Sequence, residues 1–170
     1  MQMRLHPHAW EWRTPDWQTA AVAGFAASAI LMVLELLWTA SVGGAGPWAT
    51  TRMIAAIALG QGVLQGSGFD LGVVTVALLI HYLLGIFSGI VIGIVISGFD
   101  WEQSPAAMQA IGAVFGAVIY LVNFHLVTQL FPWVAEMRGW ATFVGHLVFG
   151  MSATAMYWKL SRRLDPALRL

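Results

Sequence analysis

The chain has 170 residues, of which 59% are hydrophobic and only 9% are charged, and its mean hydropathy is +0.75. Soluble domains carry about 25% charged residues, so the composition predicts an integral membrane protein. Eight basic and eight acidic residues cancel, and no global field would attract nucleic acid or an acidic partner. Cysteine is absent, which excludes disulfides, iron–sulfur clusters and thioether-attached haem.

The predicted fold class is all-α, an integral membrane four-helix bundle embedded in the lipid bilayer. Four apolar segments approach or exceed the roughly 20 residues that a helix needs to cross a bilayer. Tryptophans, which prefer the membrane interface, flank these segments. We expect a polar leader at 1–16, spans at about 17–40, 71–97, 106–131 and 140–158, and a basic tail at 159–170.

The connector between the first two spans, residues 41–70, contains a further helical segment. Residues 50–60 predict a short helix that Thr50 or Thr51 caps. At about ten residues this helix is too short to cross a bilayer. We therefore expect an interfacial or re-entrant helix in the first external connector.

Basic residues set the predicted orientation. Four spans place both termini on one side, together with six basic residues, and leave two on the other side. The positive-inside rule then puts both termini in the cytoplasm and the connector 41–70 outside. The six residues are Arg4, Arg13, Lys159, Arg162, Arg163 and Arg169, and the two are Arg52 and Arg138.

The second span carries one strongly ionisable residue, His81, above a ladder of glycines. Gly85, Gly89 and Gly93 follow it at four-residue steps, which puts them on the same helical face. Such a ladder lets another helix approach closely, and a histidine at membrane depth is costly without a partner. The pattern predicts a close helix contact beside a polar site.

Each predicted span supplies one ionisable group at a similar depth: Glu35, His81, His125 and His146. With a rise of about 1.5 Å per residue, all four are expected roughly 9–12 Å below the external surface. Three imidazoles and a carboxylate without a thiolate suit zinc, copper, iron or nickel. Met32 or Met151 would add a soft ligand for cuprous copper.

Other chemistry fits the same four groups. Two of the histidines could be the axial ligands of haem b, and a Glu/His cluster could also serve as a proton or cation relay. A purely structural role is the third interpretation, in which a histidine bonds a carbonyl on the next helix or Glu35 pairs with His81. Asn123 is expected to bond between helices.

Arg52 and Arg138 are the candidate cofactor-binding residues. At the external mouth they could neutralise haem propionates or an anionic substrate, or contact lipid head groups. Both residues lie on the side that the charge distribution assigns to the exterior.

Six short motifs are spread over residues 17–158: Pro47-Trp48, Arg52–Gly60, Phe69-Asp70, Tyr120–Phe124, Phe131–Trp133 and His146–Gly150. In these motifs the chain resembles a family of small four-span bacterial inner-membrane proteins of unknown function, sometimes labelled sodium:proline symporters. The resemblance implies a multi-pass protein of the bacterial inner (plasma) membrane. It does not imply symport, because transporters of that kind need a larger inverted-repeat bundle.

Three functions are compatible with the sequence. The leading hypothesis is a transition metal (Zn, Cu or Fe) or haem b site formed by Glu35, His81, His125 and His146, used in redox chemistry, sensing or metal handling. A small oligomeric transporter or channel, coupled to protons or cations, is the second. The third is an accessory subunit that packs against a larger membrane complex and performs no chemistry.

Overall fold

A computed structural model describes residues 12–42, 46–99 and 105–164 of the chain. Within these residues the chain is helical and forms no strand, which confirms the all-α prediction. Most of the predicted leader and the end of the basic tail lie outside the described residues. The long helices are α1 (Trp17–Ser41), α3 (Leu71–Phe99), α4 (Pro105–Leu121) and α5 (Trp140–Leu164), and a shorter one is α2 (Pro47–Leu59).

The third predicted span is not one uniform helix. After α4 the chain forms a π-helical turn, η3 (Val122–Leu126), and then a 3-10 turn, η4 (Val127–Gln129). Two further 3-10 segments lie in the connectors, η1 (Gln61–Gln65) after α2 and η5 (Pro132–Met137) before α5.

Three helical segments of the described chain are long and apolar enough to cross a membrane: Trp17–Ser41, Leu71–Gly98 and Pro105–Gln129. The protein is therefore a helical membrane protein. The helix α5 is as long as α1 but less apolar, because it continues through Lys159 and Arg162 instead of ending near Trp158. The predicted basic tail thus begins inside α5.

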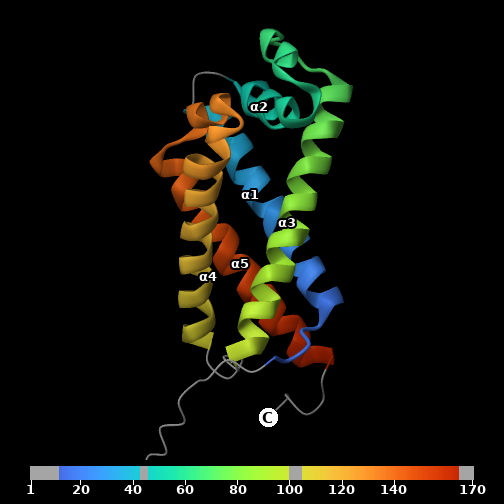
Figure 1. The fold of residues 1–170 in the computed structure, drawn as a ribbon, viewed down its shortest axis with the longest axis vertical. Coiled ribbons are helices and arrows are strands. Elements are labelled where there is room, and N and C mark those ends of the chain that lie inside the picture. Colours follow the sequence, from blue (N-terminus) through green and yellow to red (C-terminus); the bar gives the residue numbers. More distant parts are fainter. Residues whose placement is uncertain (1–11, 43–45, 100–104, 165–170) are drawn as a thin grey trace, which may run out of the picture.

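The long helices are arranged as two pairs (Figure 1). The helix α1 packs along α3, α4 packs along α5, and the pairs are joined mainly where α1 packs on α5. By contrast, α3 and α4 make few contacts with each other. The short helix α2 lies across one end of the bundle, while the start of α1 and the end of α5 lie at the opposite end. We call the first of these the α2 end.

Local sequence explains where the helices begin. Asp16 caps α1: one carboxylate oxygen accepts the backbone N–H of Thr19 at 3.0 Å, and the other accepts the Thr19 hydroxyl at 2.7 Å. Proline is the first residue of both α2 and α4, a position where its missing N–H costs nothing. Pro105 thus begins α4 next to the start of the predicted span 106–131, whereas α2 begins at Pro47, three residues before the predicted Thr50.

Glycines hold each pair of helices together. A Cβ on Gly89 would lie 2.6 Å from the Cα of Gly24, which confirms that the predicted ladder is a close helix contact, here with α1. The second pair, α4 and α5, also has a close contact at glycines, since a Cβ on Gly112 of α4 would lie 2.6 Å from the carbonyl oxygen of Gly150 on α5. Both contacts are as close as backbone packing allows.

Candidate functional site

A cavity of about 410 Å³ lies in the middle of the bundle, and we call it the central cavity. Residues of α1, α2, α3, α4, η3, η5 and α5 all contribute to its lining. Most of the lining is apolar, as is usual for a small-molecule site. The polar lining side chains are Ser28, Glu35, His81, Ser88, Asn123 and His146.

His81 projects from α3 and is held by α1. Its Nε2 lies 2.8 Å from the carbonyl oxygen of Ser28. Because a carbonyl only accepts, Nε2 carries the proton and donates it. The Nδ1 atom of the neutral ring is then an unprotonated acceptor. His81 therefore joins two helices through one nitrogen and keeps a lone pair on the other.

His146 is held in a similar way on α5. Its side chain is only 5% exposed, and its Nδ1 donates to the carbonyl oxygen of Thr142, one turn earlier, at 2.8 Å. The Nε2 atom is again an acceptor, and Asn123 Nδ2 of the π-helical turn approaches it at 3.4 Å. Asn123 thus makes the interhelical bond that the sequence predicted.

The two histidines occupy corresponding places in the two helix pairs. His81 precedes Gly85 by four residues, and His146 precedes Gly150 by four residues. Both glycines are at close contacts with the partner helix of their pair. Each imidazole therefore sits one turn toward the α2 end from a fixed helix crossing, which limits its possible positions.

Glu35 lies where three hollows meet. Besides the central cavity, it lines a smaller pocket of about 80 Å³ beneath α2, here named the α2 pocket. It also lines a hollow of about 480 Å³ against η5 and the start of α5, which we call the α5 hollow. Among the described residues its carboxylate has no hydrogen-bond or ion-pair partner. A carboxylate at this depth is costly unless it is protonated or paired.

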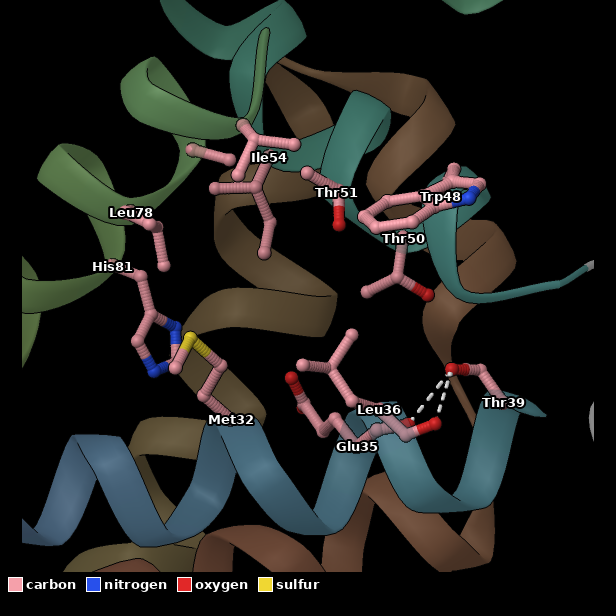
Figure 2. Close-up of a pocket in the computed structure, with 12 residues that line it drawn as sticks. Met32, Glu35, Leu36, Thr39, Trp48, Thr50, Thr51, Ile54, Leu78 and His81 are labelled. Atoms are coloured by element: carbon pink, nitrogen blue, oxygen red, sulfur yellow. Dashed lines mark hydrogen bonds between the residues drawn. The ribbon is translucent and has the colours of Figure 1, made fainter. Parts of the chain in front are cut away.

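Figure 2 shows how the side chains lie in the α2 pocket. The Glu35 side chain points from α1 into the space below α2, and the Met32 thioether and the His81 ring point toward each other. The helix α2 closes this space with Trp48, Thr50, Thr51 and Ile54. Elsewhere on α2 the carbonyl oxygen of Met53 accepts a hydrogen bond from the Trp133 indole at 3.0 Å.

The other predicted site residues lie elsewhere. His125 is exposed and does not line the central cavity. Arg52 is buried, and its guanidinium donates to the carbonyl oxygens of Val63 at 3.0 Å and Gly68 at 2.6 Å. Arg138, at the α5 hollow, donates to the carbonyl oxygen of Phe124 in the π-helical turn. Both arginines thus bind backbone carbonyls.

The structure therefore brings together Glu35, His81 and His146 and leaves out His125. Within the described part of the chain, no three His, Asp or Glu side chains are grouped closely enough to hold a metal ion as they stand. Asn123 takes the place that the sequence gave to His125. Helical periodicity indicates that Asn123, and not His125, is on the helical face that carries Gly116. Asn123 is seven residues after Gly116, and His125 is nine residues after it. At about 100° per residue, Asn123 shares the glycine face and His125 lies on the opposite face.

The fold and the cavity thus define a helical membrane protein with an internal, partly polar cavity. Comparisons with protein families, with curated proteins and with solved structures find no match for the chain.

Proposed function

We propose that this protein binds a cation in the central cavity, between Glu35, His81 and His146. The observation that supports the proposal is the set of acceptors that these residues present. Both imidazoles use their N–H group on a backbone carbonyl, so each offers a lone pair on its other nitrogen. On His146 this nitrogen also accepts from Asn123 Nδ2 at 3.4 Å, a long bond that a cation would have to displace. The Glu35 carboxylate has no counter-charge among the described residues. A bound cation would supply that charge.

The membrane arrangement in this proposal has four spans. The helix α5 runs the same length of the bundle as α4 (Figure 1) and packs between its neighbours. A helix that other helices cover needs less apolar surface than one that faces lipid. Together with the basic residues near the termini, this favours both termini in the cytoplasm and α2 on the external face of a bacterial inner membrane.

A transition-metal ion is one cation that would satisfy these acceptors, in line with the sequence. Zinc, copper and iron bind imidazole, and each histidine already donates its other ring N–H to a carbonyl, as metal-bound histidines do. The side chains of Glu35, His81 and His146 would have to move closer together to complete the site. Haem b would need both His81 and His146 as axial ligands. An organic ammonium ion is the other class, since it needs acceptors but no fixed coordination geometry.

The test is cation binding to the purified protein in lipid nanodiscs. Isothermal titration with Zn²⁺ and with methylammonium should show binding of at least one of them to the wild type. Glu35→Gln should weaken that binding by roughly tenfold or more, because a hydrogen bond to a charged group contributes about 1.5–3 kcal/mol. The matched control is Glu136→Gln, at an exposed carboxylate of the α5 hollow. Equal binding by Glu35→Gln would contradict the proposal, as would the absence of binding for Zn²⁺, Cu⁺, methylammonium and octylammonium alike.

Elemental analysis and a reduced-minus-oxidised optical spectrum test the metal and haem forms separately. A metal or haem that copurifies and disappears in His81→Asn and His146→Asn would support them. The control is His125→Asn, which changes an imidazole outside the cavity. Metal-free, colourless protein that gains no stability from zinc, copper or haem would rule out both forms and leave the organic cation.

Transport is the second candidate function, favoured by the position of Glu35 at the junction of three hollows. A cation on Glu35 could be reached from the α5 hollow and from the central cavity, as a translocation path requires. Vesicles that contain the protein should then take up protons or the bound cation, and Glu35→Gln should stop the uptake. Binding without uptake would contradict transport and leave the binding proposal intact.

A further inference from the structure

The central cavity opens sideways, at the surface where α3 and α4 face each other with few contacts. Three of its lining side chains are also on the outside of the bundle: Leu84 is 51% exposed, Phe87 is 64% exposed and Val122 is 39% exposed. All three are apolar. In a membrane-spanning bundle this surface faces lipid, so the opening leads to the hydrocarbon of the bilayer.

The opening follows from the way the helices are paired. Glycine contacts fix α3 against α1 and α4 against α5, and the pairs meet through α1 and α5. Toward the α2 end α3 and α4 stand apart, whereas at the opposite end they approach each other (Figure 1), where Ile92 and Ile96 of α3 and Met108 of α4 share a buried cluster. A path formed by fixed helix pairs does not depend on the movement of a loop.

An apolar part of the central cavity extends from the two histidines away from α2. His81 and His146 lie nearer the α2 end than Phe87 and Phe149, which follow them by six and three residues on α3 and α5. Glu35, near the last turns of α1, lies on the same side as the histidines. The three acceptors thus border an apolar chamber that reaches the lateral opening, where Ser88 is the polar lining side chain, and further apolar side chains line the cavity on the α2 side.

We infer that the ligand is a lipid-borne amphipathic amine, with an ammonium head on the acceptors and an apolar chain in the chamber. The inference rests on the proposed cation site and names its ligand class. A bare metal ion would need neither the apolar chamber nor an opening toward lipid. A volume of about 410 Å³ lies within the range of roughly 300–1,000 Å³ for small-molecule pockets.

Octylammonium, methylammonium and octanoate are suitable probes, added to the full-length protein in nanodiscs. Specific binding is measured as the difference between the wild-type signal and the Glu35→Gln signal. Partition of the probe into the lipid contributes equally to both signals and cancels. We expect octylammonium to bind at least roughly tenfold more tightly than methylammonium, since apolar surface leaves water. Octanoate, an anion of the same length, should show no binding that depends on Glu35.

Two tryptophan substitutions test the lateral opening. Leu84→Trp and Val122→Trp should each remove the advantage of octylammonium by narrowing the opening. Their matched controls are Leu83→Trp and Leu121→Trp, at exposed neighbours that do not line the cavity. Thermal unfolding checks that each variant is folded, and either of the two opening variants suffices for the comparison.

The outcomes separate this inference from the proposed function. Octylammonium that binds no more tightly than methylammonium, or an opening variant that binds like its control, would overturn the lipid-borne ligand. If Zn²⁺ or methylammonium still bound through Glu35, the cation site would stand. If the wild type showed no Glu35-dependent binding of any cation, both the lipid-borne ligand and the cation site would be contradicted.

Discussion

The Nε2–H group of His81 on α3 donates to the carbonyl oxygen of Ser28 on α1 across 2.8 Å. The bond lies one turn from the glycine contact between the same two helices, where a Cβ on Gly85 would lie 2.5 Å from the Ser28 side chain. The histidine is therefore part of the helix contact and also part of the cavity wall. This bond fixes the tautomer that leaves Nδ1 as the acceptor for the proposed cation.

Replacing His81 by alanine should reduce stability modestly. The bond to Ser28 joins two helices, and such bonds in membranes contribute about 0.6 kcal/mol on average and at most about 1.7 kcal/mol. Equilibrium unfolding in mixed micelles would measure the change in the free energy of unfolding. Thr75→Ala is the control on the same helix, because the Thr75 hydroxyl is exposed and bonds only within α3. A loss far above 2 kcal/mol would show that this one bond does not describe the role of His81.

Adding a methyl group at Gly89 should separate α1 from α3. Its Cβ would collide with the carbonyl oxygen of Ala20 and would lie 2.6 Å from the Cα of Gly24, both of them backbone atoms. Overpacking of this kind costs about 1–3 kcal/mol, so Gly89→Ala should lower the unfolding temperature. Gly62→Ala meets nothing within 4 Å and should have little effect. Equal effects of the two substitutions would contradict the close contact.

Removing the cap of α1 should destabilise the helix start. Asp16→Ala loses both bonds to Thr19, and the loss of such a cap costs about 0.5–2 kcal/mol. Asp16→Asn should lose much less at pH 7, because asparagine caps helices about as well. Thermal unfolding should rank the wild type first, Asp16→Asn next and Asp16→Ala last in stability. A lower unfolding temperature for Asp16→Asn than for Asp16→Ala would contradict this prediction.

The same cap predicts a dependence on pH. The hydrogen bonds from Thr19, above all from its backbone N–H, lower the pKa of Asp16 from its ordinary value of 3.8. A lowered pKa in the folded state means that the ionised cap adds stability above the ordinary value, and this stability is lost as the pH falls through the lowered pKa. The unfolding temperature of the wild type should therefore fall relative to Asp16→Asn between pH 5 and pH 2. A constant difference over that range would contradict the prediction.

Arg52→Lys should loosen the connector that follows α2. Arginine reaches the carbonyl oxygens of Val63 and Gly68 with two nitrogens, whereas lysine offers a single ammonium group without the planar fork. Hydrogen exchange of the amides in η1 should become faster while exchange in α3 stays the same. The control is Gln65→Ala, an exposed side chain in the same segment. Unchanged exchange in Arg52→Lys would show that other contacts hold the connector.

Much of the fold follows from local chemistry that the sequence displays. The apolar segments predicted the beginnings of α1, α3 and α5 to the residue, and Pro105 marked the start of α4. The start of α2 at Pro47 was missed, although proline at the first helical position is itself a start signal. The helix α5 continues to Leu164, beyond the predicted span 140–158, because long basic side chains can stay on a helix that leaves the membrane.

The candidate site was only partly predictable. Glu35, His81 and His146 line one cavity, but the position of a residue along a helix does not say which face its side chain occupies. The face of His125 follows from its spacing to Gly116, a comparison that would have favoured Asn123 instead. The π-helical turn was not predicted, and the Arg138 side chain binds the Phe124 carbonyl within it. A contact between residues 14 positions apart has no local sequence signal.

The most direct test of the cation site is a comparison of unfolding temperatures for the wild type and Glu35→Gln, with and without added cation. Zn²⁺, Cu⁺ and octylammonium would each be added at increasing concentration, since a ligand of the folded state raises the unfolding temperature. The proposal predicts that at least one of them stabilises the wild type and that Glu35→Gln removes this effect, while Glu136→Gln keeps it. No stabilisation by any of the three, or the same stabilisation in Glu35→Gln, would contradict the account.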